Sequence, residues 1–204
     1  MTNSELALEI KDKLKTTYPD IIVWIEQDKK DPFRTAVFFV EEKFRDLYPL
    51  QRFHYLMHTL SEEYLETLSV RLPNARWYEL APGQAPEDLR YPDEKEIEEI
   101  TPYIMGALAE CKFFEKLDDL MAPADATISP KPCNDNFSLS RSVLRECGFS
   151  DNKDGYDEFF DIFHVLMDKG GFCDCEILYN AAPESRSRPN YWTKKAEKSQ
   201  YNQE

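Results

Sequence analysis

Two cysteines near the C-terminus are the residues whose type and spacing best suit chemistry. Cys173 and Cys175 are separated by a single residue within 172–180, a segment that we expect to be a strand. Side chains two residues apart on a strand point to the same face, so both sulfurs would project together. A further thiolate from Cys133 and the carboxylate of Asp135 could complete a tetrahedral site, because zinc and iron accept such ligands. The sequence therefore predicts a metal site at these four residues, with zinc as the first candidate.

Two other interpretations of these cysteines stay open. Free cysteines are among the most buried residue types and can act as small apolar side chains. The pair could also be a structural or redox-active dithiol. The one-residue separation differs from the two-residue separation of typical zinc knuckles, so the spacing alone does not choose among the three.

The three histidines give weaker signals. His54 and His58 are four residues apart, as in a metal pair, but lack the acidic residue that the zinc-protease motif places between them. His164 lies at helical spacing from Asp161 and Asp168. We expect His164 to be exposed and ion-paired with these acids.

An acidic segment at 150–161 resembles a calcium-binding loop in outline. Gly155 fits the glycine position of such a loop, but Ser150 and Asp161 stand where Asp and Glu are required. A turn with acids that cap the next helix explains this segment better. The chain also has no glycine-rich phosphate loop, nucleophile elbow or Cys–His signature, so the sequence does not indicate an enzyme.

Composition bounds the classes of partner. The 204 residues carry a formal net charge of −14, which opposes binding to nucleic acid because that affinity comes from Lys and Arg displacing phosphate counterions. No apolar run approaches the ~20 residues that span a bilayer. The charged N-terminal sequence does not resemble a signal peptide, and five scattered cysteines suit reduced thiols. We expect a cytoplasmic protein that is not associated with a membrane.

The pattern of apolar residues indicates an α+β protein. Thr2 and Glu5 form a candidate capping box at the start of the first helix. Two segments rich in β-branched and aromatic residues follow, at 21–27 and 35–42, and are predicted to form a hairpin. A long helix is expected at 49–69 and a short strand at 76–80. The N-terminal module is therefore predicted to have the order helix–strand–strand–helix–strand within residues 1–90.

The rest of the chain is expected to add helices and a second module. Thr101 and Pro102 are typical of a helix start, so an extra helix at 101–120 would complete an N-terminal domain of residues 1–120. Proline and small residues dominate 121–132, which we interpret as a linker. Residues 133–182 are predicted to form a small domain of two helices and a strand, and 183–204 a flexible tail.

Some N-terminal residues resemble the BolA-like fold, a relative of the type II KH fold. Arg52-Phe53-His54, Tyr78-Glu79-Leu80 and Pro86-Glu87-Asp88 stand where that family has its characteristic segments. The family's C-terminal histidine, an iron–sulfur ligand, would fall at Tyr78. A phenol is a poor substitute, so the resemblance implies a fold and not cluster binding.

The C-terminal module resembles the domain-of-unknown-function family 2695, a family of short bacterial modules. The resemblance rests on the sequence Gly-Gly-Phe-Cys-Asp-Cys-Glu at 170–176, with Asn180 just beyond it. Upstream, the segment that begins at Pro132 and Cys133 stands where the family has a cysteine-containing opening. The family implies no activity.

The sequence therefore leaves three hypotheses for the function. The first is a non-enzymatic binding or adaptor protein, with a protein partner that contacts exposed aromatics such as Trp24, Trp77 and Trp192. The second is a metal-binding protein that uses the C-terminal cysteines. The third is an RNA-binding protein that uses the KH-like module, which the net charge opposes.

Overall fold

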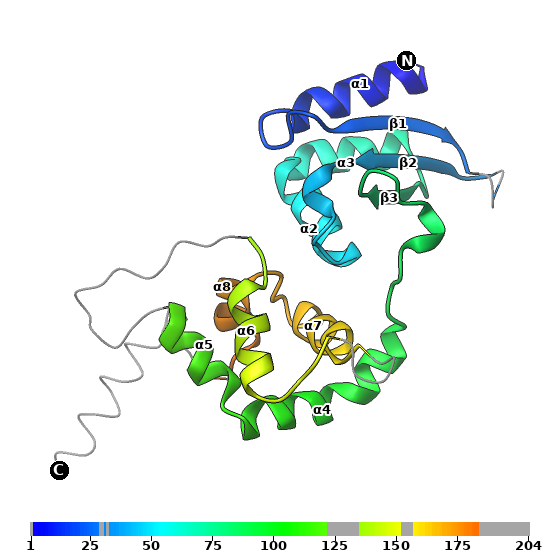
Figure 1. Ribbon diagram of the computed structural model, residues 1–204. Coiled ribbons are helices and arrows are strands. Elements are labelled where there is room, and N and C mark those ends of the chain that lie inside the picture. The colour runs from blue at the N-terminus through cyan, green and yellow to red at the C-terminus, as the bar shows by residue number, and fades with distance from the viewer. Residues whose placement is uncertain (1, 29–30, 32, 122–134, 152–156, 184–204) are drawn as a thin grey trace, which may run out of the picture. The chain divides into compact units, whose positions relative to one another are not determined.

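The computed structural model describes residues 2–28, 31, 33–121, 135–151 and 157–183. It separates into two compact units, residues 1–91 and 92–204, which are considered one at a time (Figure 1). Together they form an α+β protein, as the sequence predicts. No helix in these ranges is both long enough and apolar enough to cross a membrane.

The first unit contains a three-stranded mixed sheet. The strands lie in the order β1-β2-β3, with β1 and β2 antiparallel and β2 and β3 parallel. Its elements follow the predicted order, with one extra helix: α1 (Asn3–Leu14), β1 (Ile22–Gln27), β2 (Thr35–Val40), η1 (Glu42–Phe44), α2 (Pro49–Thr59), α3 (Glu62–Arg71), β3 (Arg76–Leu80) and η2 (Pro86–Asp88).

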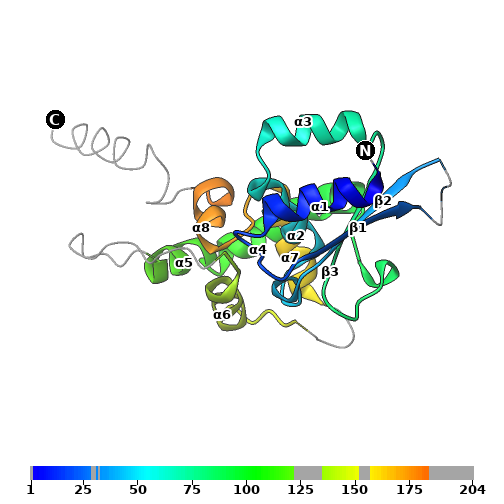
Figure 2. The same cartoon turned by 90° about the horizontal axis from the view of Figure 1, so that it is seen from above.

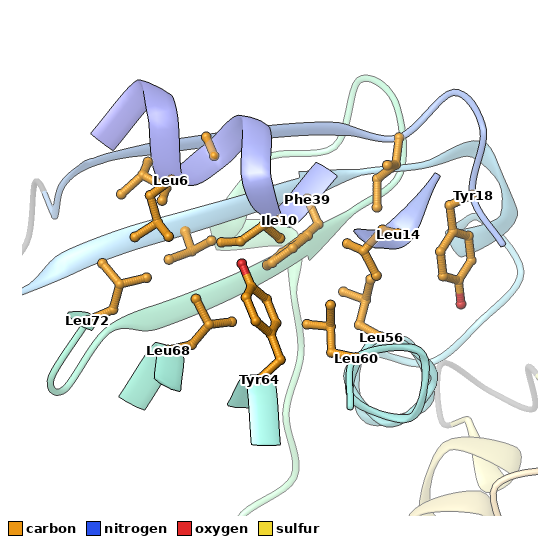
Figure 3. Packing of buried hydrophobic residues seen from close by; sticks show 14 of the residues in the cluster. Leu6, Ile10, Leu14, Tyr18, Phe39, Leu56, Leu60, Tyr64, Leu68 and Leu72 are labelled. Carbon is orange, nitrogen blue, oxygen red and sulfur yellow. The ribbon is translucent and has the colours of Figure 1, made fainter. Parts of the chain in front are cut away.

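The three α-helices of this unit, α1, α2 and α3, pack on the same face of the sheet (Figures 1 and 2). Figure 3 shows how the core is assembled, with side chains from all three helices meeting around Phe39 of β2. Phe39 is fully buried because alternate residues of β2 point into this core. The capping box at the start of α1 is confirmed, since Thr2 Oγ1 accepts a hydrogen bond from Glu5 N and Glu5 Oε2 accepts one from Thr2 N.

The predicted long helix at 49–69 is two helices. The chain is extended at Leu60, and Ser61 begins α3 by accepting a hydrogen bond from Tyr64 N through its side chain. A serine followed by acids is a strong helix-start signal, and here it interrupts an otherwise continuous apolar pattern. Leu56, Leu60 and Leu68 are buried, as the periodicity predicted.

The second unit is entirely helical within the described residues. Its elements are α4 (Glu94–Glu110), α5 (Phe113–Met121), α6 (Ser138–Glu146), α7 (Glu158–Asp168), α8 (Asp174–Glu176) and η3 (Ile177–Ala181). The predicted start at Thr101-Pro102 is wrong. Asp93 caps α4 through Lys95 N and Glu96 N, and Pro102 lies inside the helix.

The predicted strand at 172–180 is also wrong, because this segment forms α8 and η3. A lone strand leaves its backbone N–H and C=O groups without partners, and every described strand belongs to the first unit. A helical segment satisfies these groups within itself. The C-terminal module therefore has no strand in its described part.

The unit boundary differs from the predicted one. The extra helix was assigned to the N-terminal domain, but α4 packs against α7, and α5 against α6. The boundary falls near Tyr91, and not at 121–132. Of that predicted linker only Met121 is described, and it is buried at the end of α5. The predicted tail beyond Pro183 lies outside the described residues.

Candidate functional site

The two C-terminal cysteines lie together at the start of α8. Cys173 Sγ and Cys175 Sγ are 3.1 Å apart. Cys173 is buried, and Cys175 is half-buried. The two sulfurs are close together, as predicted, but the segment is not a strand. Cys173 is extended, with φ −150° and ψ 173°, and the chain enters a helix directly after it. The result is a dithiol that is open on the Cys175 side.

Of the other two predicted metal ligands, only Asp135 is among the described residues. Cys133 lies outside the described residues, and Asp135 is exposed with a positive φ of 51°. Among the described side chains, no group of three or more His, Cys, Asp or Glu residues is arranged to hold a metal ion. Asn136 O accepts a hydrogen bond from Asp174 N at 3.0 Å. The segment that follows Asp135 therefore runs beside the cysteine pair.

Asp174, between the two cysteines, joins α8 to the start of α6. Its carboxylate accepts hydrogen bonds from Leu139 N and Ser140 N, both at 2.9 Å, and from Ser140 Oγ. Burial raises the pKa of Asp174, and the hydrogen bonds from Ser140 and Leu139 oppose this rise. The carboxylate satisfies backbone N–H groups in the first turn of α6 that have no partner within the helix.

Two polar residues near the cysteine pair, Glu176 and Asn180, make hydrogen bonds that stabilise the turn between α7 and α8. Glu176 Oε2 accepts a hydrogen bond from Phe172 N at 3.0 Å. Asn180 Nδ2 donates one to Gly170 O at 2.7 Å. Gly170 adopts φ +82°, a backbone conformation that residues other than glycine rarely adopt. It follows the last turn of α7 and ends that helix. The motif thus builds a tight helical return that positions the two sulfurs.

Gly171 is required by close packing. A Cβ atom there would lie 2.9 Å from Ile177 Cγ1, 3.0 Å from Ile177 Cα and 3.1 Å from Leu166 O. We expect Gly171→Ala to lower the free energy of unfolding of this unit by ~1–3 kcal/mol, since backbone atoms must shift to admit the methyl group. Denaturant unfolding measures the loss.

Gly106→Ala is the matched control for this prediction. Gly106 lies inside α4, and a Cβ there would meet no atom within 4 Å. Alanine should leave stability unchanged or raise it by up to ~1 kcal/mol, because glycine is the weaker helix former. Equal effects of the two substitutions would contradict the packing role of Gly171.

Residues 120–180 match the model of a family described as a protein of unknown function (DUF2695). This confirms the predicted resemblance of the C-terminal part of the chain. No curated protein and no solved structure matches the chain. The resemblance of residues 1–90 to the BolA-like and type II KH folds therefore stays a prediction.

His164, within the DUF2695 segment, is not the exposed residue that the sequence predicted. It is 1% exposed, its Nδ1 is hydrogen-bonded to Phe160 O, and its ring lies 4.0 Å from the Phe160 ring. The prediction failed because α7 is buried around most of its circumference, so the face that carries Asp161 and Asp168 was taken for the solvent side. His164 is a core residue.

The remaining histidines and the calcium-like loop give no site among the described residues. The rings of His54 and His58 are 4.2 Å apart on α2, and His58 is exposed. Residues 152–156 of the loop lie outside the described ranges. Asp157 caps α7 through Phe160 N, as the prediction of helix-capping acids required.

A buried polar network in the first unit was missed by the sequence analysis. Arg52 Nη1 donates to Glu79 O at 2.7 Å and to Gln84 Oε1 at 2.6 Å, and Tyr91 OH donates to Glu79 Oε2 at 3.2 Å. Burial raises the pKa of Glu79 to about 7. One signal could have revealed it. Glu79 lies two residues after Trp77 on β3, so its side chain points to the same face of the sheet as Trp77, which packs against the core.

The opposite face of the same sheet carries a row of stacked aromatic rings. Trp24 and Phe38 are stacked with centroids 4.6 Å apart, and Phe38 and Tyr78 with centroids 5.0 Å apart. Trp24 is 36% exposed and Ile22 is 56% exposed, both on the edge strand β1. Of the other predicted aromatic contacts, Trp77 is half-buried and Trp192 lies outside the described residues.

Proposed function

We propose that this chain is a non-enzymatic binding protein whose C-terminal unit takes up a thiophilic metal ion, first of all zinc, through Cys173 and Cys175. The observation that supports this is the 3.1 Å separation of the two sulfurs. Two thiolates at ~2.3 Å from one tetrahedral zinc lie roughly 3.8 Å apart. A side-chain rotation that separates the sulfurs by roughly 0.7 Å would reach that geometry.

Two ligands do not complete a tetrahedral zinc site. We propose Cys133 and Asp135 as the others. The hydrogen bond from Asp174 N to Asn136 O supports this, because Asp135 is the neighbour of a residue held beside the pair, and Cys133 lies three positions before that residue in the sequence. Binding would be stronger at higher pH, since thiols lose protons to bind metal. A cytoplasmic location, where thiols stay reduced, is part of the proposal.

The test is a titration of the reduced full chain with Cd²⁺, followed by thiolate-to-metal absorption, and competition with Zn²⁺. Cys173→Ser and Cys175→Ser should each weaken metal binding by about 10-fold to 100-fold or more. Substitutions of residues that only hydrogen-bond to a metal ligand already have effects of about that size. Cys133→Ser and Asp135→Asn test the other two ligands individually.

Cys111→Ser is the matched control, because Cys111 is also a half-buried cysteine of this unit. It should leave the affinity unchanged. Equal affinities of the wild type and of the Cys173 and Cys175 variants would contradict the proposal. Weaker binding in those variants alone would support it.

A protein partner at β1 is a second candidate function. Ile22 and Trp24 offer exposed apolar surface on a strand that pairs on one side only with β2 in the described sheet. Such an edge can pair with an extended segment of another protein. A photoreactive residue at position 24 should crosslink to that partner, whereas one at position 70, where Val70 is also exposed, should not. RNA binding by the KH-like module remains the third candidate, and the charge of −14 still opposes it.

A further inference from the structure

A second pair of cysteines lies at the ends of two helices in the C-terminal unit. Cys111 ends α4, where its N–H bonds to Ala107 O, and Cys147 ends α6, where its N–H bonds to Val143 O. Each is followed by a residue with positive φ, Lys112 at 58° and Gly148 at 90°, which turns the chain away. The backbone therefore fixes both cysteines at helix ends.

The Cys147 thiol lies against the backbone of Cys111, and a lysine contacts it. Cys147 Sγ donates a hydrogen bond to the carbonyl oxygen of Cys111 at 3.6 Å and accepts one from Lys116 Nζ at 3.7 Å. Burial, followed by interactions with the Cys147 thiol, raises the pKa of Cys111 to about 11. Both cysteines are half-buried, so a small oxidant can reach them.

We propose that Cys111 and Cys147 form a reversible disulfide in response to hydrogen peroxide. The Cys147 thiolate attacks one peroxide oxygen, the O–O bond breaks, and hydroxide leaves, so that Cys147 becomes a sulfenic acid. The Cys111 thiol then attacks the Cys147 sulfur and forms the S–S bond. Water leaves with the sulfenic oxygen and the thiol proton. The sum is two thiols and one peroxide giving one disulfide and two waters.

The surroundings assign different roles to the two cysteines. The thiolate is the nucleophile, and a neighbouring cation favours it. Lys116 Nζ donates a hydrogen bond to Cys147 Sγ, and on this contact we assign the attack on peroxide to Cys147. Cys111, whose pKa is raised, stays protonated and acts second as the resolving thiol.

This pair is separate from the proposed metal site. Asp174, between Cys173 and Cys175, binds the first turn of α6 at Leu139 and Ser140, whereas Cys147 lies at the other end of that helix. At 1.5 Å per residue the two ends are about 11 Å apart. A disulfide at Cys111 and Cys147 would join the ends of α4 and α6 without using either sulfur of the proposed metal site.

The experiment treats the reduced, chelator-treated full chain with a small excess of hydrogen peroxide, then blocks remaining thiols and maps disulfide-linked peptides by mass spectrometry. We expect the Cys111–Cys147 peptide to be the main product and dithiothreitol to reverse it. In Cys111→Ser the sulfenic acid should persist at Cys147, where dimedone traps it. Lys116→Met should slow disulfide formation about 3-fold to 10-fold, as expected for loss of a cation beside a thiolate.

Lys112→Met is the control for the charge, because Lys112 is an exposed lysine in the same turn and should leave the rate unchanged. Absence of the Cys111–Cys147 peptide from the oxidised wild type, or random pairing among all five cysteines, would overturn the proposal. Equal rates for the Lys112 and Lys116 variants would overturn the role of Lys116. The wild-type map decides the main claim even where a variant folds poorly.

Discussion

Replacing Asp174 by alanine is expected to lower the free energy of unfolding of the C-terminal unit by ~2–4 kcal/mol. The substitution removes the shared acceptor of Leu139 N, Ser140 N and Ser140 Oγ. Ser140 is fully buried, so its donors cannot turn to solvent. A buried donor without a partner costs ~1–3 kcal/mol, and the favourable charge at the start of α6 is lost as well.

Hydrogen exchange at the Leu139 and Ser140 amides measures this effect at the bonds concerned, and denaturant unfolding followed by circular dichroism measures the global loss. Asp174→Asn should have an intermediate effect, because one acceptor oxygen remains. Glu146→Ala, an exposed acid on α6, should stay within ~0.5 kcal/mol of the wild type. An Asp174→Ala variant as stable as the Glu146 control would contradict the assigned role.

Glu79 is expected to make the N-terminal unit less stable as pH rises. Burial raises its pKa from 4.5 to about 7, so between these values the folded chain holds a proton that the unfolded chain has lost. The stabilising contribution is complete below pH 4.5 and is lost as pH rises through 7. Between pH 5 and pH 8 the loss amounts to ~2–3 kcal/mol.

Glu79→Gln should abolish this dependence, because the amide does not titrate and can still accept the hydrogen bond from Tyr91. The measurement is denaturant unfolding at pH 5 and pH 8, followed by the fluorescence of Trp24 and Trp77 in a Trp192→Phe background. The stability of Glu79→Gln relative to its parent should rise by ~2–3 kcal/mol over that interval. Other titrating groups cancel in the difference.

Glu87→Gln is the control for the pH experiment, because Glu87 is an exposed acid close to Glu79 in the sequence. Its stability relative to the parent should not change with pH. If the Glu79 variant shows the same flat difference, Glu79 ionises normally in the folded protein, and the buried network with Arg52 and Tyr91 has no role in pH dependence.

Most of the first unit could be predicted because its signals are local. The capping box at Thr2 and Glu5, the hairpin strands and the leucine periodicity each depend on a few adjacent residues. The division of the long helix at Ser61 followed a local signal too, but one that competes with a continuous apolar stripe. A serine before two glutamates prevailed because the helix start satisfies backbone groups directly.

The second unit was harder because tertiary contacts override local preference there. The residues at 172–180 favour a strand by type, but a strand needs a partner that the described part of this unit lacks. Asp174 instead fixes the segment against α6, a contact between residues more than thirty positions apart. The assignment of α4 and α5 to this unit likewise depends on packing against α7 and α6.

The side-chain clusters also divide into those that depend on local spacing and those that depend on tertiary contacts. The proximity of Cys173 and Cys175 could be predicted, because residues two apart stay near each other in several backbone conformations. The contacts of Cys147 with Cys111 and Lys116, and those of Arg52 with Glu79, join distant segments and could not. Spacing predicts neighbours within an element, whereas the fold decides which elements meet.

The metal content of the purified protein is the most direct test of the proposed function. Elemental analysis of the reduced full chain, after equilibration with zinc and removal of loosely bound ions, should give one zinc per chain. The Cys173→Ser/Cys175→Ser double variant should hold none, while Cys111→Ser should match the wild type. A wild-type chain without bound metal, or a double variant that retains one ion per chain, would contradict the account.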